Sequence, residues 1–130
     1  MPTPFPGLTT IGQIAINAHD VERATAFYRD VLGLRFLFAA PGLAFFDCSG
    51  VRLMLSKAEK PEFDHPASIL YYKVDDLEAA CTALAERGVA IESAPHLIAR
   101  MPDHELWMAF VRDSEANLLG LMCEKRSQPS

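Results

Sequence analysis

The sequence lacks the run of about 20 apolar residues that a membrane-spanning helix needs, and no membrane association is expected. Its start lacks the basic and long apolar regions of a signal peptide, so we expect a cytoplasmic protein. The 3 cysteines are scattered and form no CxxC pair, which indicates reduced thiols packed in a core. The net charge is −5 without a basic stripe, and this argues against nucleic-acid binding.

What the sequence does contain is enough apolar surface for one compact domain, because half of its 130 residues are hydrophobic. Its first half begins with a segment of alternating polar and apolar residues at 10–17, which predicts a half-buried strand. Helical spacing follows over 20–32, with Asp20 as the expected N-cap and Gly33 as the stop. Three short strands are then predicted, at 35–39, 43–48 and 52–56.

The same pattern starts again after a charged segment that contains two prolines. A strand is predicted at 68–74, a helix at 76–87 and a strand from 89, whose continuation past Pro95 stays open. Two further strands are expected at 105–112 and 118–124. Strand, helix and three strands therefore occur twice, which predicts two tandem βαβββ modules. We expect one domain over 10–124, with module one at 10–57, a linker at 58–67 and module two at 68–124.

Three short strings carry a resemblance to a known family. They are FYRDVLGL at 27–34, KVDDL at 73–77 and AFVRDSEAN at 109–117. The chain resembles the vicinal oxygen chelate superfamily, which includes glyoxalase I, bleomycin-resistance proteins and extradiol dioxygenases. Ser114 and Ala116 stand where that superfamily usually has Pro and Gly. The resemblance implies an α+β fold in which the modules form a curved, mostly antiparallel sheet around a cavity, and it implies a homodimer.

The resemblance also implies a metal held by one side chain from each of four strands. The four positions fall on Gln13, Met54, Ile69 and Gly120 of this sequence. Only Gln13 carries a donor that such a metal centre accepts. The thioether of Met54, the alkyl group of Ile69 and the hydrogen of Gly120 are not ligands for such a metal. We therefore expect no metal and no other cofactor at the usual site.

Strand alternation predicts which side chains line the cavity instead. Gly120 is expected to leave it open, because the superfamily has a long side chain there. The alternative is that Met54, Ile69 and Met122 pack together and close it. The candidate ligand-binding residues from this argument are Gln13, Asn17, Arg52, Met54, Tyr71 and Gly120.

The segment from Pro95 to Met108 is chemically the richest part of the chain. We expect a hairpin centred near 101–103 that lets His96 and His104 face each other across two strands. These histidines, with Arg100 and Trp107, are further candidates for ligand contact. A relocated divalent metal at His96, His104 and Glu105 is an alternative, because imidazole is a good ligand near neutral pH. The other alternative is a hairpin whose polar side chains only face water.

Three functions remain open. The first is metal-independent binding of a small molecule, of the sequestration or resistance type, in a glyoxalase/bleomycin-resistance/dioxygenase-like cavity. The second is a lyase, isomerase or dioxygenase of the glyoxalase type with a non-standard site, so whether the chain is an enzyme stays undecided. Its electrophile would be Arg52, Lys73 or Tyr71, with His96 or His104 as the base. The third is a partner-binding module whose cavity is filled.

Overall fold

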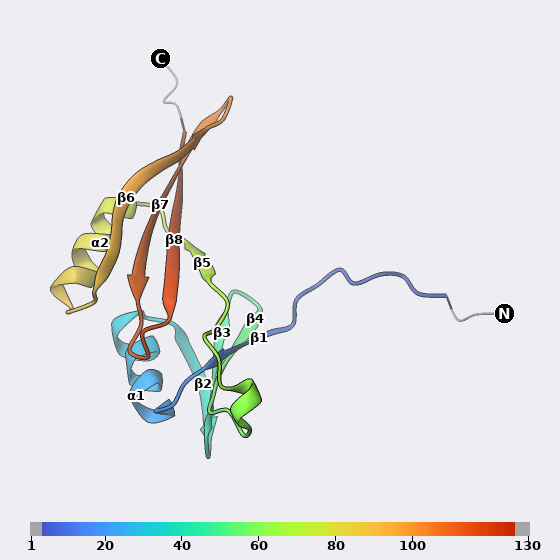
Figure 1. The fold of residues 1–130 in the computed structure, drawn as a ribbon. Coiled ribbons are helices and arrows are strands. Elements are labelled where there is room, and N and C mark those ends of the chain that lie inside the picture. The colour runs from blue at the N-terminus through green and yellow to red at the C-terminus, as the bar shows by residue number, and fades with distance from the viewer. Residues whose placement is uncertain (1–3, 127–130) are drawn as a thin grey trace.

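The computed structural model describes residues 4–126 and consists of two βαβββ modules, each with one helical segment over its sheet (Figure 1). No helix formed by these residues is long and apolar enough to cross a membrane. The elements of module one are β1 (Gln13–Asn17), α1 (Val21–Ala26), the π-helical turn η1 (Phe27–Val31), β2 (Arg35–Ala40), β3 (Leu43–Cys48) and β4 (Val51–Ser56). The short 3-10 turn η2 (Pro61–Phe63) follows, and module two contains β5 (Leu70–Lys73), α2 (Leu77–Glu86), β6 (Ile91–Arg100), β7 (His104–Arg112) and β8 (Leu118–Arg126).

The two sheets have the same topology. Their strand orders are β1-β4-β3-β2 and β5-β8-β7-β6, so the first strand of each module pairs in parallel with its last strand. The other neighbours are antiparallel. The α+β class and the repeat predicted from the sequence are confirmed. The chain forms two separate four-stranded sheets that are not closed, whereas the resemblance led us to expect one curved sheet.

Each helix begins where the sequence indicated. The side chains of Asp20 and Asp76 accept hydrogen bonds from the amides of Arg23 and Ala79, both at 3.0 Å. Such N-caps satisfy amides that the first helical turn leaves without partners. The predicted helix at 20–32 is α1 followed by η1, whose wider turn closes with Leu32 N–H donating to the Phe27 carbonyl at 3.0 Å.

Strand β6 is longer than the sequence suggested, because it runs through Pro95. A proline removes a ladder hydrogen bond and is tolerated at a sheet edge or beside a bulge. Both conditions hold here, since β6 is the edge strand of its sheet and the β6–β7 register shifts between Ser93 and His96. Edge position was not visible in the sequence, and this is why the continuation had stayed open.

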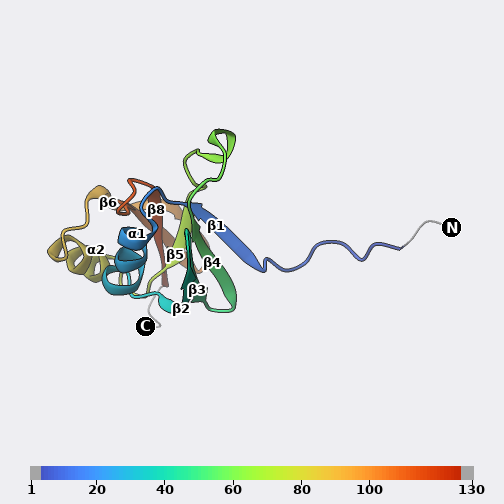
Figure 2. The same cartoon turned by 90° about the horizontal axis from the view of Figure 1, so that it is seen from below.

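The buried core lies on the helix-covered faces of the sheets. In module one it is built around Tyr28 and Phe46, and in module two around Leu77 and Val111, all fully buried. The π-helical turn serves both, because Phe27 and Leu32 pack against each cluster. The helices of the two modules accordingly lie on the same side of the molecule (Figures 1 and 2). The opposite faces of the sheets carry no helix, and we call them the open faces.

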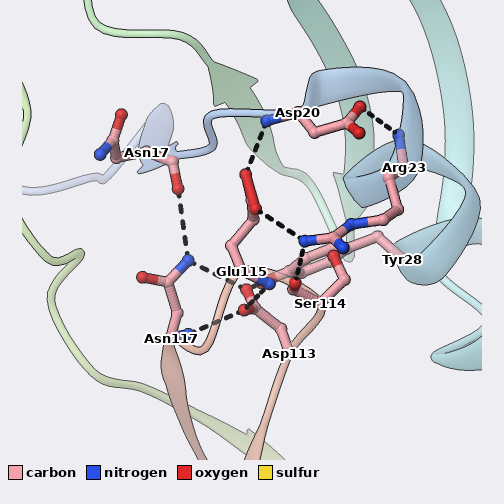
Figure 3. Close-up of polar contacts among 8 residues, drawn as sticks. All are labelled: Asn17, Asp20, Arg23, Tyr28, Asp113, Ser114, Glu115 and Asn117. Carbon is pink, nitrogen blue, oxygen red and sulfur yellow. Dashed lines mark hydrogen bonds and ion pairs between the residues drawn. The ribbon is translucent and has the colours of Figure 1, made fainter.

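A buried carboxylate connects the modules at the β7–β8 turn (Figure 3). Asp113 Oδ2 accepts a hydrogen bond from the Tyr28 hydroxyl at 2.7 Å. Asp113 Oδ1 accepts from the amides of Glu115 and Asn117, each at 2.8 Å, which shapes the turn itself. Ala116 in this turn has φ 64°, a conformation that glycine adopts without steric cost. The position at which the superfamily usually has glycine is therefore left-handed in this chain too.

Charged groups on the surface extend this connection. Glu115 accepts hydrogen bonds from the Asp20 amide at 2.8 Å and from Arg23 Nη2 at 3.2 Å. The same Arg23 nitrogen donates to the Ser114 carbonyl at 2.6 Å. The turn of module two is thus anchored to the start of α1 in module one, as Figure 3 shows.

Removal of the Tyr28 hydroxyl tests this connection. Tyr28→Phe leaves a buried carboxylate one donor short, so the free energy of unfolding should fall by about 1–3 kcal/mol. Tyr71→Phe is the matched control, because Tyr71 is 47% exposed and should change stability by less than about 0.5 kcal/mol. Chemical denaturation of both variants measures the difference. Equal stability of the two would show that the Tyr28–Asp113 contact does not hold the modules together.

Candidate functional site

Module one places four of the candidate residues on its open face. In the parallel β1–β4 register, Gln13 lies beside Arg52 and Ala15 beside Met54, while Asn17 ends the same row. Their sequence neighbours, among them Ile16 and Leu53, are buried on the helix-covered face. The period of two in a strand therefore separates the polar row from the core.

An aromatic pair beside this row was missed by the sequence analysis. Phe38 and Phe45 stack with ring centroids 4.5 Å apart, and the Arg52 guanidinium lies 5.8 Å from the centre of the Phe45 ring. Phe45 is 8% exposed and Phe38 is 49% exposed, so the Phe38 ring supplies most of the flat apolar surface next to this positive charge. The run from Leu43 to Phe46 is apolar throughout, so alternation could not assign Phe45 to either face. Phe45 pairs with Met54, and this pairing places it on the open face.

Module two presents a second aromatic group on its open face. The Tyr71 ring lies over Gly120, where an added Cβ would overlap the ring carbons. Tyr71 meets Phe110 edge to face at 5.9 Å, and His96 lies on the other side of Phe110 at 6.4 Å. The expectation that Gly120 leaves the surface open is wrong. The missing side chain is replaced by the neighbouring strand's aromatic ring.

Trp107 and Arg100, two of the candidate ligand-binding residues, lie on the helix-covered face of module two. Trp107 packs against the helix-side core, and its Nε1 donates to Glu105 Oε1 at 3.1 Å. Arg100 pairs with the same carboxylate at 3.5 Å near the hairpin end. Neither joins Tyr71 and Gly120. The sequence analysis grouped them by closeness along the chain. Alternation along β7 puts Trp107 opposite His104, and the register shift of β6 between Leu97 and Ala99 puts Arg100 beside Glu105.

The two histidines do not face each other. His96 is paired with Met108, four residues from His104, which separates the two by about 13 Å along the strand. His104 Nδ1 instead lies 2.8 Å from Asp103 Oδ1 beside the turn. Glu105 belongs to the opposite face, so the alternative metal set of His96, His104 and Glu105 is not assembled. Within residues 4–126, no group of three or more His, Cys, Asp or Glu side chains could hold a metal.

The usual metal positions of the superfamily do not fit a metal in this chain either. Gln13 Nε2 lies 3.7 Å from the sulfur of Met54, so the one suitable side chain faces a thioether. Ile69 has no donor, and the place of the fourth ligand holds the Tyr71 ring. A divalent ion with oxygen and nitrogen preferences would find at most one protein ligand there.

A cavity of about 430 Å³ opens at the edge of the open face of module one. Its floor includes Asn17 and Met54, and the segment that links the modules forms its roof with Phe63 and His65. Asn17 Nδ2 holds this segment by donating to Asp64 Oδ1 at 2.8 Å and to the His65 carbonyl at 3.3 Å. Asn17 Oδ1 is buried and has no hydrogen-bond partner among residues 4–126.

A histidine strengthens the same attachment. His19 Nε2 lies 2.6 Å from Asp64 Oδ1, and the hydrogen bond and charge of Asp64 raise the pKa of His19. The pKa of Asp64 is lowered, first by its hydrogen bond to His19 and then by that to Asn17. Both side chains are substantially exposed, so the pair is weak and its effect is local.

The sign of these shifts predicts how the attachment depends on pH. Because the folded-state pKa of His19 is raised, its contribution is present below the ordinary value of 6.5 and is lost as pH rises through the raised value. The contribution of Asp64 is lost at the acid end, as pH falls through its lowered pKa. The protection factors of amides in the linking segment, residues 58–67, should therefore fall as pH rises through the pKa of His19.

Titration of His19 by NMR checks this prediction. Asp64→Asn should return the pKa of His19 toward 6.5. Asp103→Asn is the matched control, since it removes the carboxylate beside His104 and should leave His19 unchanged. The same His19 titration in both variants would refute the attachment.

The family is decided by comparison with known sequences. Residues 10–119 match the family described as the Glyoxalase/Bleomycin resistance protein/Dioxygenase superfamily. The chain belongs to this superfamily. The resemblance predicted from the three sequence strings is thereby confirmed.

Three individual relatives of this superfamily member share less than a third of their residues with it. The chain is 29% identical over 124 residues to the uncharacterized protein YraH of Bacillus subtilis (strain 168). The match covers 82% of this chain and 92% of that protein. Among solved structures, a glyoxalase/bleomycin resistance protein/dioxygenase from Nocardioides has a TM-score of 0.69 at 22% identity, with 97% of this chain and 93% of that one covered. A lactoylglutathione lyase from Agrobacterium tumefaciens has a TM-score of 0.67 at 25% identity, covering 89% and 94%. These similarities support the fold rather than a particular reaction.

The replacement of a ligand position by an aromatic ring can be tested by a double-mutant cycle. Gly120→Ala should destabilise the protein because its Cβ displaces the Tyr71 ring. In a Tyr71→Ala background the same change should cost less, with a coupling of about 0.5–3 kcal/mol in the free energy of unfolding. Gly12→Ala is the control, since an added Cβ there meets no atom within 4 Å. An equal cost of Gly120→Ala in both backgrounds would contradict the arrangement.

Proposed function

We propose that this superfamily member binds a small organic molecule on its open sheet faces without the superfamily's usual metal centre. The observation that carries the proposal is the Tyr71 ring over Gly120, because an aromatic surface takes the place of a metal ligand. Sequestration of a metabolite or an antibiotic is the form of function that fits best, since binding then needs no electrophile.

The lining suggests the chemistry of the ligand. Phe38 and Phe45 form a stacked surface in module one, and Tyr71 and Phe110 form an edge-to-face pair in module two. Flat, partly apolar molecules suit such surfaces, while Arg52 favours an anionic group on the ligand. A planar molecule with an acidic group is the ligand we propose.

A second copy of the chain belongs to the same proposal. Each open face leaves large apolar side chains in solvent, with Phe38 49%, Ile69 43% and Tyr71 47% exposed. Isolated sheets with such faces gain by lying against another surface. A homodimer that brings the sheet of one chain to the sheet of another would enclose the ligand. Action in the cytoplasm is also proposed, in keeping with three free thiols.

A ligand screen in the presence of a chelator tests the proposed function. Planar aromatic carboxylates are screened by ligand-observed NMR against the protein with EDTA and without it. We expect the same binders under both conditions. Arg52→Gln should weaken them about tenfold, which corresponds to 1.4 kcal/mol. Arg29→Gln is the matched control. Arg29 also lies over a phenylalanine ring, at 5.9 Å from the centre of Phe36, but it belongs to the helical segment of module one and not to the open face.

Three outcomes would overturn the proposal. Binding that EDTA abolishes would mean that a metal takes part after all. Chemical conversion of each binder at saturation would favour the alternative, a lyase, isomerase or dioxygenase that uses a non-standard site. Arg52→Gln and Arg29→Gln variants that bind equally well would remove the open face from ligand recognition.

A further inference from the structure

A hollow between the two modules lies on the helix-covered side, away from the open faces. Its volume is about 340 Å³, and it is lined by the end of η1, the C-terminal part of β5 and one side of α2. Leu32 and Leu34 contribute from module one, whereas Val111 and Leu119 form part of the wall in module two. This volume lies within the range of pockets that take small organic ligands.

Helix α2 makes this space by presenting small residues. Ala80, Ala83 and Leu84 face the hollow, and Arg87 follows directly after the helix. Spacings of three and four place these side chains on one face of the helix. Longer side chains at the two alanines would close the gap against η1. The apolar wall is therefore a property of the α2 sequence.

The rim of the hollow carries a positive charge. Arg87 belongs to the lining and forms no ion pair with another residue of the described part of the chain. Arg87 Nη1 donates to the Val31 carbonyl at 2.8 Å, and the other two guanidinium nitrogens form no hydrogen bond with residues 4–126. The lining formed by residues 4–126 contains no carboxylate. In a protein of net charge −5, this local excess of positive charge favours an anionic occupant.

We propose that the hollow is a second binding site, separate from the open faces, for a small amphipathic anion. The apolar body of the ligand packs against Ala80, Ala83 and Leu84. Its anionic group lies beside Arg87. Since this site joins η1 of module one to α2 of module two, its occupant stabilises the contact between the modules.

Fluorescence of anilinonaphthalene sulfonate tests the proposal. This probe is an aromatic anion that becomes fluorescent in apolar surroundings, and phenylnaphthylamine is its neutral counterpart. We expect saturable binding of the anion at one site per chain and weaker binding of the neutral probe. Ala83→Phe should fill the hollow and lower the affinity at least about tenfold. Arg87→Gln should remove the preference for the anionic probe while keeping a donor for the Val31 carbonyl.

Ala85→Phe is the matched control, because Ala85 lies on the same helix and does not line the hollow. It should bind the probe as the original protein does. An equal effect of Ala83→Phe and Ala85→Phe would overturn the site, as would loss of probe binding in Arg52→Gln, which would place the probe on the open face. Equal binding of the two probes would overturn the choice of an anion. Tighter binding on dilution would show that a second copy of the chain covers the hollow, and this too would overturn the proposal.

Discussion

The contact between Tyr28 and Asp113 is the constraint on which the rest of the structure depends. A buried carboxylate is costly unless its oxygens are hydrogen-bonded, and Asp113 has donors from its own turn and from the other module. This arrangement fixes the β7–β8 turn of module two against the helical segment of module one. The helix-covered sides of both sheets consequently face a common interior, and the open faces are left to other partners.

The open faces carry aromatic and apolar side chains where the superfamily usually has metal ligands. The superfamily's ligand positions hold a thioether at Met54, an alkyl chain at Ile69 and the Tyr71 ring over Gly120. The same change that removes a ligand adds aromatic area. The charged group that remains beside the aromatic rings of module one is Arg52.

Much of the fold could be predicted because local signals agreed with one another. Asp20 and Asp76 were predicted as helix starts and are N-caps in the structure. The site was less predictable. Alternation placed Gln13 and Met54 on one face, but closeness in sequence wrongly joined Trp107 to His104. Phe45 was missed because it lies in a run that is apolar throughout, and such a run carries no periodicity.

The sequence by itself determined the repeat, the positions of the helices and strands and the residue types at the superfamily's ligand positions, because each of these depends on residue type and spacing within a short stretch. Only the tertiary structure decided which strand lies at the sheet edge, where Pro95 is tolerated. It alone decided that the Tyr71 ring fills the space at Gly120, and that the two modules leave a hollow beside Ala83. These features arise from contacts between residues far apart in the chain, whose distances no local pattern specifies.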